Sequence, residues 1–342
     1  MKATDTENIG VNGLEVTRLG IGGTAFGNMY SASSSKEAKL LIDAAIARGI
    51  RYFDTAPLYG FGLSETRLGE GLESHDRNSF VISSKVGYML VPESEGEVKE
   101  TPFVDVPPLT TIFDFSRDGT LRSIDSSLSR LKTDRLDIVL IHDPDESKSI
   151  EPGWSPGDAG FYKEVMNGAY PTLEKLRDDG VVKAIGLGMN QWQMLSDFAC
   201  DGDFDCFLLA GRYTLLEQES LKKLLPLCQE RGIKIIIGGP YNSGILATGP
   251  INGAMYNYGP APESVRKHVF QIELVCKRHN VPLRSAALQF PFGHPSVASI
   301  VPGARSVKEV NDNIQLMDYE IPSEFWSELK AEKLLSSEVP TL

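Results

Sequence analysis

The sequence predicts a (β/α)8 barrel, and two features of the chain carry this prediction. Eight short runs of mostly apolar residues alternate with amphipathic segments of helical length. Continuous apolar runs are typical of parallel strands that are covered on both faces. A length of 342 residues allows two average domains or one large barrel. Eight strand–helix units favour the second, a single barrel domain over residues 1–342.

The predicted elements follow one another in strict alternation. The strands are 16–23, 50–54, 80–85, 136–142, 181–188, 205–211, 233–239 and 297–303. The helices are 36–49, 64–73, 120–132, 170–180, 220–232 and 306–317. Ser64 and Ser306 are predicted to cap helix N-termini, and Gly180 and Gly232 to end helices.

A doubly wound sheet with a dinucleotide-binding fingerprint is the competing fold. Its support is GIGGTA at 20–25, which fits the pattern G-x-G-x-x-A loosely. No helix is predicted directly after this segment, because NMYSASSS intervenes. No acidic residue about 20 residues further on closes a second strand. The barrel is therefore the preferred interpretation.

Two connections are long and lack periodicity, at 86–119 and 143–169. Both follow predicted strands, so in a barrel both would lie over the active face. Loops of this length more often act as lids over an active site than as simple connections; the alternative is that they are solvated insertions. The last residues, 336–342, are expected to form a frayed tail.

Composition argues against several classes of protein. The net charge of −12 argues against a nucleic-acid surface and against binding to an anionic membrane. Four cysteines form no C-x-x-C pair, and no metal-ligand spacing is present, so no metal site is predicted. No apolar run approaches the length of a membrane span. We expect a cytoplasmic enzyme that acts on a small molecule, as a monomer or homodimer.

Three successive predicted strands end in an ionisable side chain. Asp54 closes IRYFD, Lys85 closes FVISSK and His142 closes LDIVLIH, while Tyr59 follows Asp54 in the next loop. Because the carboxyl ends of barrel strands meet at one face, the four side chains would be neighbours. Together they can move a proton at a carbon-bound oxygen, which is half of a hydride-transfer reaction.

The charges predict how Tyr59 would be activated. An ammonium near a phenol lowers the pKa of the phenol from about 10, and a carboxylate keeps the ammonium charged. Asp54, Lys85 and Tyr59 fit this chain, with His142 hydrogen-bonded to the substrate oxygen. The alternatives are a structural Asp54–Lys85 ion pair, a core histidine at 142 and a packing role for Tyr59.

The segments that contain these residues resemble the aldo-keto reductases. FDTAPLYGFGLSETRLGEGL (53–72), SSKVG (83–87) and LIHDP (140–144) follow in the expected order. The resemblance covers essentially the whole chain and implies a barrel that holds an extended nicotinamide cofactor. It also implies that Tyr59 is the general acid-base, tuned by Lys85 and Asp54, and that His142 orients the substrate.

The resemblance implies cofactor contacts in four further segments, at 22–27, 188–191, 238–247 and 302–313. Ala210 and Gly238 stand where a glutamine and a stacking aromatic are usual, which leaves Tyr213 as a nearby ring. The implied contacts are Thr24, Ala25, Asp54, Asn190, Tyr213, Tyr241, Asn242, Ser243, Gly244, Leu246, Gly303, Arg305, Glu309 and Asn313.

The adenosine-ribose segment predicts NAD as the cofactor, with NADP less favoured. Relatives that prefer NADP have basic residues there, whereas this chain has Gly303 and Glu309, with Arg305 as the one nearby cation. A carboxylate about 4 Å from a phosphate charge costs about 4 kcal/mol at an effective dielectric constant of 20.

Within the family, segments 113–146, 168–191 and 208–218 are most similar to aldose 1-dehydrogenases, of the L-fucose and L-galactose type, and to pyridoxal 4-dehydrogenase. These substrates share a cyclic hemiacetal. The prediction is NAD-dependent oxidation of that hydroxyl to a lactone, with Tyr59, His142 and Trp154 at the substrate. The alternatives are an NADPH-dependent carbonyl reductase and a cofactor-binding regulatory subunit.

Overall fold

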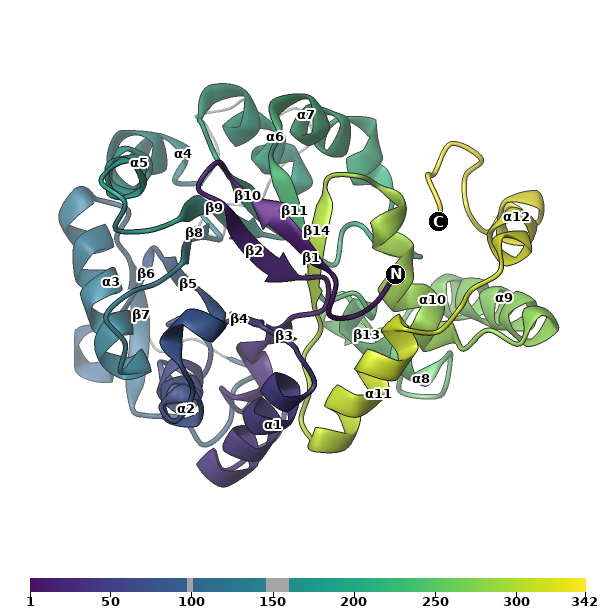
Figure 1. Cartoon of the computed structure of the whole chain (residues 1–342), viewed down its shortest axis with the longest axis horizontal. Coiled ribbons are helices and arrows are strands. Elements are labelled where there is room, and N and C mark those ends of the chain that lie inside the picture. The colour runs from purple at the N-terminus through teal and green to yellow at the C-terminus, as the bar shows by residue number, and fades with distance from the viewer. Residues whose placement is uncertain (97–100, 146–159) are drawn as a thin grey trace.

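An eight-stranded parallel sheet curls into a barrel in the computed structural model, which describes residues 1–96, 101–145 and 160–342 (Figure 1). Neighbouring strands follow chain order: β3 (Ile21–Gly22), β4 (Tyr52–Asp54), β5 (Val81–Val86), β8 (Ile138–His142), β9 (Ala184–Met189), β10 (Cys206–Ala210), β11 (Lys234–Gly238) and β14 (Val297–Val301). Parallel bridges from Leu19 to Ile300 and from Gly22 to Gly303 join the first and last strands. The predicted (β/α)8 barrel is confirmed.

Helices surround the sheet on its outer side (Figure 1). In chain order they are α1 (Ser35–Ala47), α2 (Leu63–Leu72), α3 (Arg117–Leu131), α5 (Tyr170–Asp178), α6 (Trp192–Asp201), α7 (Leu224–Arg231), α10 (Leu283–Gln289) and α11 (Val307–Met317). Additional helices are α8 (Ile245–Thr248), α9 (Glu263–His279) and the C-terminal α12 (Ser323–Ala331). The helices α6, α9, α10 and α12 were not predicted from the sequence.

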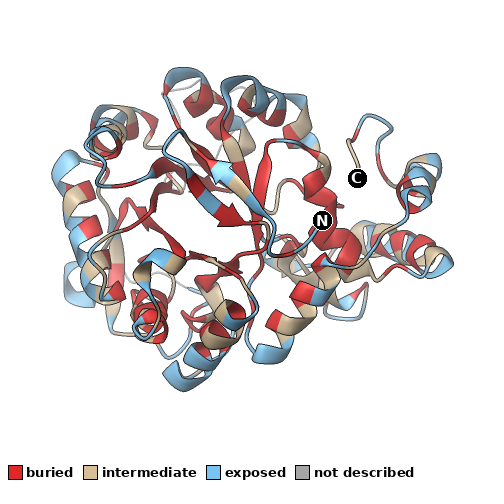
Figure 2. Cartoon of the chain, in the orientation of Figure 1, coloured by how far each residue is buried: buried red, intermediate tan, exposed pale blue. Residues whose placement is uncertain are grey.

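The apolar core has two parts, because the strands are buried on both faces. One part lies between the sheet and the helices and contains side chains such as Phe53 and Ile237. The other fills the barrel interior and contains Tyr52, Leu140 and Ile236. Figure 2 shows the buried strands at the centre of the molecule and exposed residues on the outer helix faces.

An antiparallel hairpin covers the amino-terminal end of the barrel. It consists of β1 (Thr6–Ile9) and β2 (Leu14–Thr17), and it lies across the barrel opening in Figure 1. Ile9, Leu14 and Val16 join the interior part of the core. The hairpin closes this end, so the opposite, carboxyl-terminal end is left for a site.

The first predicted strand, 16–23, was wrong in its extent. The structure divides it into the end of β2 and the short β3, with a turn at Arg18–Gly20 between them. The Thr17 hydroxyl donates to the Leu19 carbonyl at 2.7 Å within this turn. The chain needs the turn because β2 crosses the barrel end whereas β3 runs along the barrel wall.

The two long connections contain structure that the sequence did not predict. Residues 86–119 include an antiparallel hairpin of β6 (Tyr88–Pro92) and β7 (Leu109–Phe113). The described part of 143–169 includes α4 (Tyr162–Glu164) and a π-helical turn at Val165–Ala169. The C-terminal tail is packed more closely than expected, because Val339 is buried.

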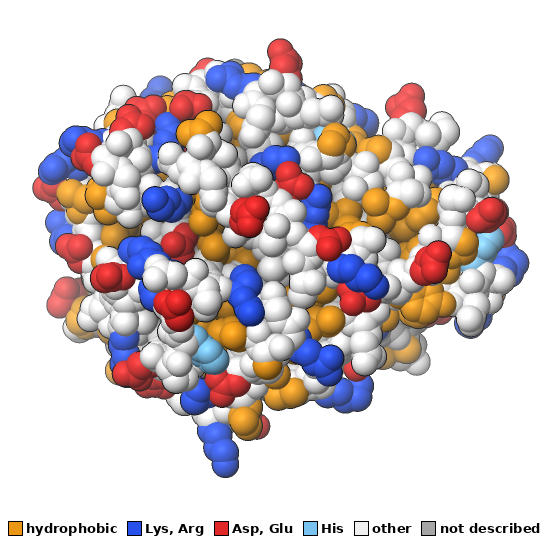
Figure 3. Space-filling model, viewed as in Figure 1, with side chains coloured by type: hydrophobic (Ala, Val, Ile, Leu, Met, Phe, Trp, Pro, Cys, Tyr) orange, Lys and Arg blue, Asp and Glu red, His pale blue; other side chains and the backbone are white. Residues whose placement is uncertain are grey.

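One face of the molecule shows how its charges are distributed. On the face drawn in Figure 3, acidic and basic side chains are interspersed. No described helix has the length and apolar character needed to cross a membrane. Within 1–96, 101–145 and 160–342, no group of three or more His, Cys, Asp or Glu side chains could hold a metal ion.

Candidate active site

The structure brings Asp54, Tyr59, Lys85 and His142 together at the carboxyl-terminal end of the barrel. Asp54 ends β4, Lys85 lies near the end of β5 and His142 ends β8. Tyr59 lies in the loop between β4 and α2. The Lys85 ammonium is 4.7 Å from the centre of the Tyr59 ring, and the Tyr59 and His142 rings are 5.8 Å apart.

Lys85 and Asp54 form a buried, fully hydrogen-bonded ion pair. Lys85 Nζ donates to the two carboxylate oxygens of Asp54, at 3.0 and 2.8 Å, and to the Thr55 carbonyl at 2.8 Å. The Ser83 hydroxyl donates to the same carboxylate at 2.7 Å. The Lys85 ammonium has three hydrogens, and these three hydrogen bonds use all of them. It therefore acts on the Tyr59 ring through its charge and not as a hydrogen-bond donor.

Tight backbone packing fixes the position of Tyr59. The loop after β3 passes against the Tyr59–Gly60 peptide so closely that a Cβ on Gly27 would lie 2.5 Å from the Tyr59 carbonyl carbon. Gly60 has a φ of 65°, which a side chain would strain. The two glycines therefore allow the loops after β3 and β4 to pack together beneath the phenol.

Burial raises the pKa of Tyr59 well above its usual value, and the charges of Asp54 and Asp143 raise it further. The sequence argument predicted a lowered pKa, because it considered the Lys85 charge and not burial. That prediction is wrong for this structure. Burial and these carboxylates outweigh the Lys85 charge, so Tyr59 is protonated at neutral pH.

His142 is a neutral imidazole in this environment. Burial, followed by the Lys85 charge, lowers the pKa of His142 well below its usual value. Within the described chain its Nδ1 has no hydrogen-bond partner, while Nε2 lies 3.5 Å from the Asp143 carboxylate. The His142 ring lines the cavity at the end of β8, so this neutral imidazole can exchange a hydrogen bond with a hydroxyl bound there.

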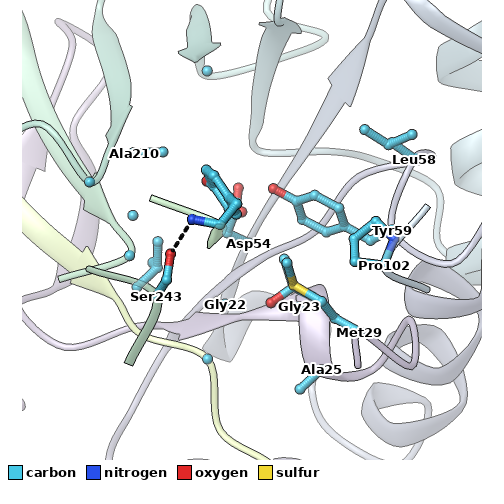
Figure 4. A pocket seen from close by; sticks show the side chains of 18 of the residues that line it. Gly22, Gly23, Ala25, Met29, Asp54, Leu58, Tyr59, Pro102, Ala210 and Ser243 are labelled. Carbon is cyan, nitrogen blue, oxygen red and sulfur yellow. Dashed lines mark hydrogen bonds between the residues drawn. The ribbon is translucent and has the colours of Figure 1, made fainter. Parts of the chain in front are cut away.

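A cavity of about 770 Å³ connects these four side chains to the ends of β9, β10, β11 and β14. Figure 4 shows Asp54 and Tyr59 pointing into it, with Met29 and Leu58 beside Tyr59 and Ser243 at the opposite side. Tyr88 lies beside His142, with ring centres 5.2 Å apart, Phe103 lies beside Tyr59 at 6.3 Å, and both rings line the cavity. The cavity is thus long enough to receive two groups, one at Tyr59 and one extending towards α11.

Most of the predicted cofactor contacts line this cavity. They are Thr24, Ala25, Asp54, Asn190, Tyr241, Asn242, Ser243, Gly244, Gly303, Arg305 and Glu309. Trp154, the predicted substrate contact, lies outside the described residues.

Three predicted contacts do not line the cavity. Tyr213 is fully buried and packs against Phe290 at 5.3 Å, so it cannot meet a ring in the cavity. Leu246 is also fully buried, within the core beneath the loop. Asn313 lies behind the cavity wall and accepts a hydrogen bond from the Tyr241 hydroxyl at 2.8 Å. The side chains of these three residues point away from the cavity, and resemblance alone does not show which way a loop residue points.

The loop after β11 has the backbone shape of an anion site. Asn242, Ser243 and Gly244 have successive φ values of 46°, 59° and 109°. Such consecutive left-handed residues make the backbone concave, and concave turns of this kind hold phosphate groups. The Asn242 side chain fixes the loop, since it accepts from the Thr214 hydroxyl at 2.6 Å and donates to the Gly211 carbonyl at 3.1 Å.

At the far end of the cavity Arg305 and Glu309 are both already engaged. The Arg305 guanidinium donates to the Ser31 hydroxyl at 2.7 Å and to the Met29 carbonyl at 2.6 Å. The Glu309 carboxylate accepts from the Arg305 backbone N–H at 2.9 Å. The arginine therefore ties the loop after β3 to the start of α11.

Several cavity residues were missed by sequence reasoning. Asp143 follows His142 directly and has a left-handed φ of 41°, which is strained for a side chain other than glycine. Arg212, Asn257 and Tyr258 come from segments without strand or helix periodicity. The pair Asn257–Tyr258 before Gly259–Pro260 is a turn signal that could have indicated a hairpin.

The fold and the four converging side chains define a class of protein, and comparisons with known proteins agree. A model of the Aldo/keto reductase family matches residues 18–333. The chain therefore belongs to the aldo-keto reductases, and it is an oxidoreductase that acts on CH–OH groups and uses a nicotinamide cofactor.

Two curated relatives are similar over nearly their whole length. A pyridoxal 4-dehydrogenase from Microbacterium luteolum is 37% identical, over 98% of this chain and 99% of that protein. A D-threo-aldose 1-dehydrogenase from a Pseudomonas species is 37% identical, over 94% and 96%. Among solved structures, the aldo-keto reductase AKR11C1 from Bacillus halodurans has the same fold, with a TM-score of 0.75, 22% identity and 98% of each chain covered.

Proposed function

We propose that this protein is an NAD-dependent dehydrogenase that oxidises the hemiacetal hydroxyl of a cyclic aldose or of pyridoxal to a lactone. The observation that carries the proposal is the arrangement of Tyr59 and neutral His142 beside the Lys85–Asp54 pair, in one cavity. The names of the two 37% identical relatives support this choice of substrates.

The residues of the cavity fit an extended dinucleotide. The concave loop at Asn242–Gly244 suits a pyrophosphate, and Asn190, whose amide donates to the Ala210 carbonyl at 2.8 Å, lies where a carboxamide would be held. When bound, the nicotinamide supplies the hydride acceptor. These protein groups would hold it with its ring towards Tyr59.

Tyr59 and His142 hydrogen-bond the substrate hydroxyl and take part in the transfer of its proton. Tyr59 hydrogen-bonds the hydroxyl, while the uncharged imidazole of His142, which lines the same cavity, accepts or shares a hydrogen bond. In the oxidation Tyr59, in its phenolate form, accepts the proton of the substrate hydroxyl, and the Lys85 charge held against the ring favours that form. Tyr88 and Phe103 offer flat apolar surfaces for a sugar or pyridine ring.

NAD is the proposed cofactor. The Glu309 carboxylate lines the cavity where a 2′-phosphate would come, and the Arg305 guanidinium is already hydrogen-bonded to Ser31 and Met29. A 2′-phosphate would meet the negative charge of Glu309, and Arg305 would have to give up its hydrogen bonds to Ser31 and Met29 in order to pair with it. Comparable kcat/KM for both cofactors, or a preference for NADP, would contradict this part of the proposal.

Carbonyl reduction is the second candidate, favoured by the raised pKa of Tyr59. A protonated phenol is the form that donates to a carbonyl oxygen. Two assays distinguish the candidates. A dehydrogenase forms NADH from NAD⁺ and a hemiacetal, whereas a carbonyl reductase consumes NADPH in the presence of an aldehyde.

The test is NADH formation, followed at 340 nm, with L-fucose, L-galactose, D-arabinose and pyridoxal. We expect turnover with at least one of them. Turnover with none would remove the assignment. A cytoplasmic location and a monomeric or homodimeric state are further parts of the proposal.

A further inference from the structure

A short hairpin carries a tyrosine over the cavity. Its strands are β12 (Met255–Tyr256) and β13 (Gly259–Pro260), and Met255 pairs with Pro260. The two-residue turn is Asn257–Tyr258, with φ values of 49° and 66°. Two left-handed residues are what such a hairpin requires, but tyrosine is an uncommon choice there. Strained residues of this kind cluster at ligand clamps.

The tip of this hairpin is fastened to the ends of two barrel strands. Arg212, just after β10, donates to the Asn257 side chain at 2.6 Å. The Tyr258 backbone N–H donates to the Ser243 hydroxyl at 2.9 Å, the hydrogen bond drawn at Ser243 in Figure 4. Asn257 also donates to Glu217 at 3.3 Å. These contacts hold Tyr258 at one place over the cavity.

The Tyr258 side chain reaches the nicotinamide end. Its hydroxyl lies 3.4 Å from the Asn190 amide nitrogen, the group expected to hold a carboxamide. The phenol is also close enough to Tyr59 to contribute to the raised pKa of that residue. Tyr258 is nevertheless 58% exposed, so its ring has a free surface.

Below the hairpin, the ends of two barrel strands carry small residues in place of aromatic side chains, which leaves space for a flat ring. Ala210 and Gly238 end β10 and β11 and line the cavity. Tyr213, the ring expected to substitute for them, is buried against Phe290. Tyr241 is held by its hydrogen bond to Asn313.

We propose that Tyr258 is a cofactor-positioning residue whose ring covers the nicotinamide end of the bound dinucleotide from the hairpin side. This inference rests on the proposed function. It assigns to the β12–β13 hairpin a ring contact that Gly238 and Ala210 cannot make from the barrel wall.

The test compares two ligands that differ only at the nicotinamide end, NAD⁺ and ADP-ribose. Their dissociation constants are measured by calorimetry for the wild type, Tyr258→Ala and Tyr258→Phe. Phe270→Ala, which removes an exposed ring on α9, is the matched control. Tyr258→Ala should weaken NAD⁺ binding about tenfold and leave ADP-ribose binding unchanged. Tyr258→Phe should stay within about threefold of the wild type, because the ring is retained.

The inference is overturned if Tyr258→Ala binds NAD⁺ like the wild type, or if it weakens both ligands equally. It is also overturned if Tyr258→Phe loses as much affinity as Tyr258→Ala, since the hydroxyl and not the ring would then matter. A wild type that binds neither ligand would overturn the proposed function as well. The three variant results test Tyr258 alone.

Discussion

The side chains of Asp54 and Lys85 are buried away from water, and the charge of each is stabilised by the opposite charge of the other. Both side chains are buried, and the pair shares hydrogen bonds with Ser83 and Thr55. Removing one partner of a buried ion pair leaves an uncompensated charge and typically costs about 3–5 kcal/mol. The pair therefore has a structural role in addition to the catalytic role that we propose.

We expect Lys85→Met and Asp54→Asn each to lower the free energy of unfolding by about 3–5 kcal/mol. The double variant should be more stable than the sum of the single effects predicts, because it leaves no charge unpaired. Urea denaturation of the four proteins measures this coupling. Strictly additive losses would show that the two side chains do not interact as the structure indicates.

Asp143 adds a second negative charge close to Tyr59, and this predicts a pH effect. Burial is the largest cause of the raised pKa of Tyr59, and the Asp143 charge adds to it. Oxidation requires Tyr59 to accept a proton, so kcat/KM should rise with pH towards this pKa. Asp143→Asn removes a charge that raises the pKa of Tyr59. The rising part of the curve of kcat/KM against pH, called the rising limb below, should therefore move to lower pH.

The pH dependence of kcat/KM for NADH formation checks this prediction. Asp125→Asn, an exposed carboxylate on α3, removes the same charge far from the site and should leave the limb in place. A limb that stays in place, or that moves to higher pH, in Asp143→Asn would contradict the account of Tyr59.

At the scale of elements, the loops after β3 and β4 position Tyr59 by packing backbone on backbone. A methyl group on Gly27 would overlap the Tyr59 carbonyl. We expect Gly27→Ala to displace the phenol and to lower kcat by up to about 100-fold, since a shift of about 1 Å can cost this much. The binding of ADP-ribose should change little.

Steady-state kinetics of Gly27→Ala test this role of the loops. Gly13→Ala is the control: Gly13 has a φ of 66° and open surroundings, so the substitution strains a remote turn. The two variants should lose stability, but only Gly27→Ala should lose kcat in the folded protein. An unaffected kcat in Gly27→Ala would contradict the argument.

The elements also explain which features could be predicted from the sequence. Barrel strands were identifiable because burial on both faces demands continuous apolar runs, and their ends indicated Asp54, Lys85 and His142. The hairpin β12–β13 was missed because its two-residue strands are too short to show any periodicity. It holds Tyr258, so this part of the site was missed as well.

Local signals were correct where the chain was exposed and wrong where it was packed. Ser306 caps α11 as predicted, through a bond from the Glu309 N–H at 3.2 Å. Ser64 does not cap α2, which begins after Gly62 at a φ of 89°. The Ser64 hydroxyl instead donates to the Gly23 carbonyl at 2.7 Å. A tertiary contact of this kind has no signature in the neighbouring residues.

At the scale of the whole molecule, stability and chemistry lie at opposite ends of the barrel. The hairpin β1–β2 covers one end with Ile9, Leu14 and Val16, and the candidate site occupies the other. Ile9→Ala should therefore cost about 2–5 kcal/mol of unfolding free energy without changing kcat of the folded protein. The control Val11→Ala, at a position 92% exposed, should stay within about 0.5 kcal/mol of the wild type.

Thermal or denaturant unfolding, combined with kcat corrected for the folded fraction, tests this separation. A loss of kcat in folded Ile9→Ala would mean that the two ends are coupled. Ala210 and Gly238 also lie at the site end of the barrel, so the absence of large side chains there is compatible with an intact barrel.

The central claim is that Tyr59 moves the proton while the cavity holds the dinucleotide, and one comparison tests it most directly. In a single-turnover experiment with saturating NAD⁺ and a substrate of the wild type, NADH absorbance is followed in the wild type and in Tyr59→Phe. We predict that Tyr59→Phe binds NAD⁺ with an unchanged dissociation constant and forms NADH about 10²–10⁴ times more slowly. NADH formation at the wild-type rate in Tyr59→Phe would contradict the account.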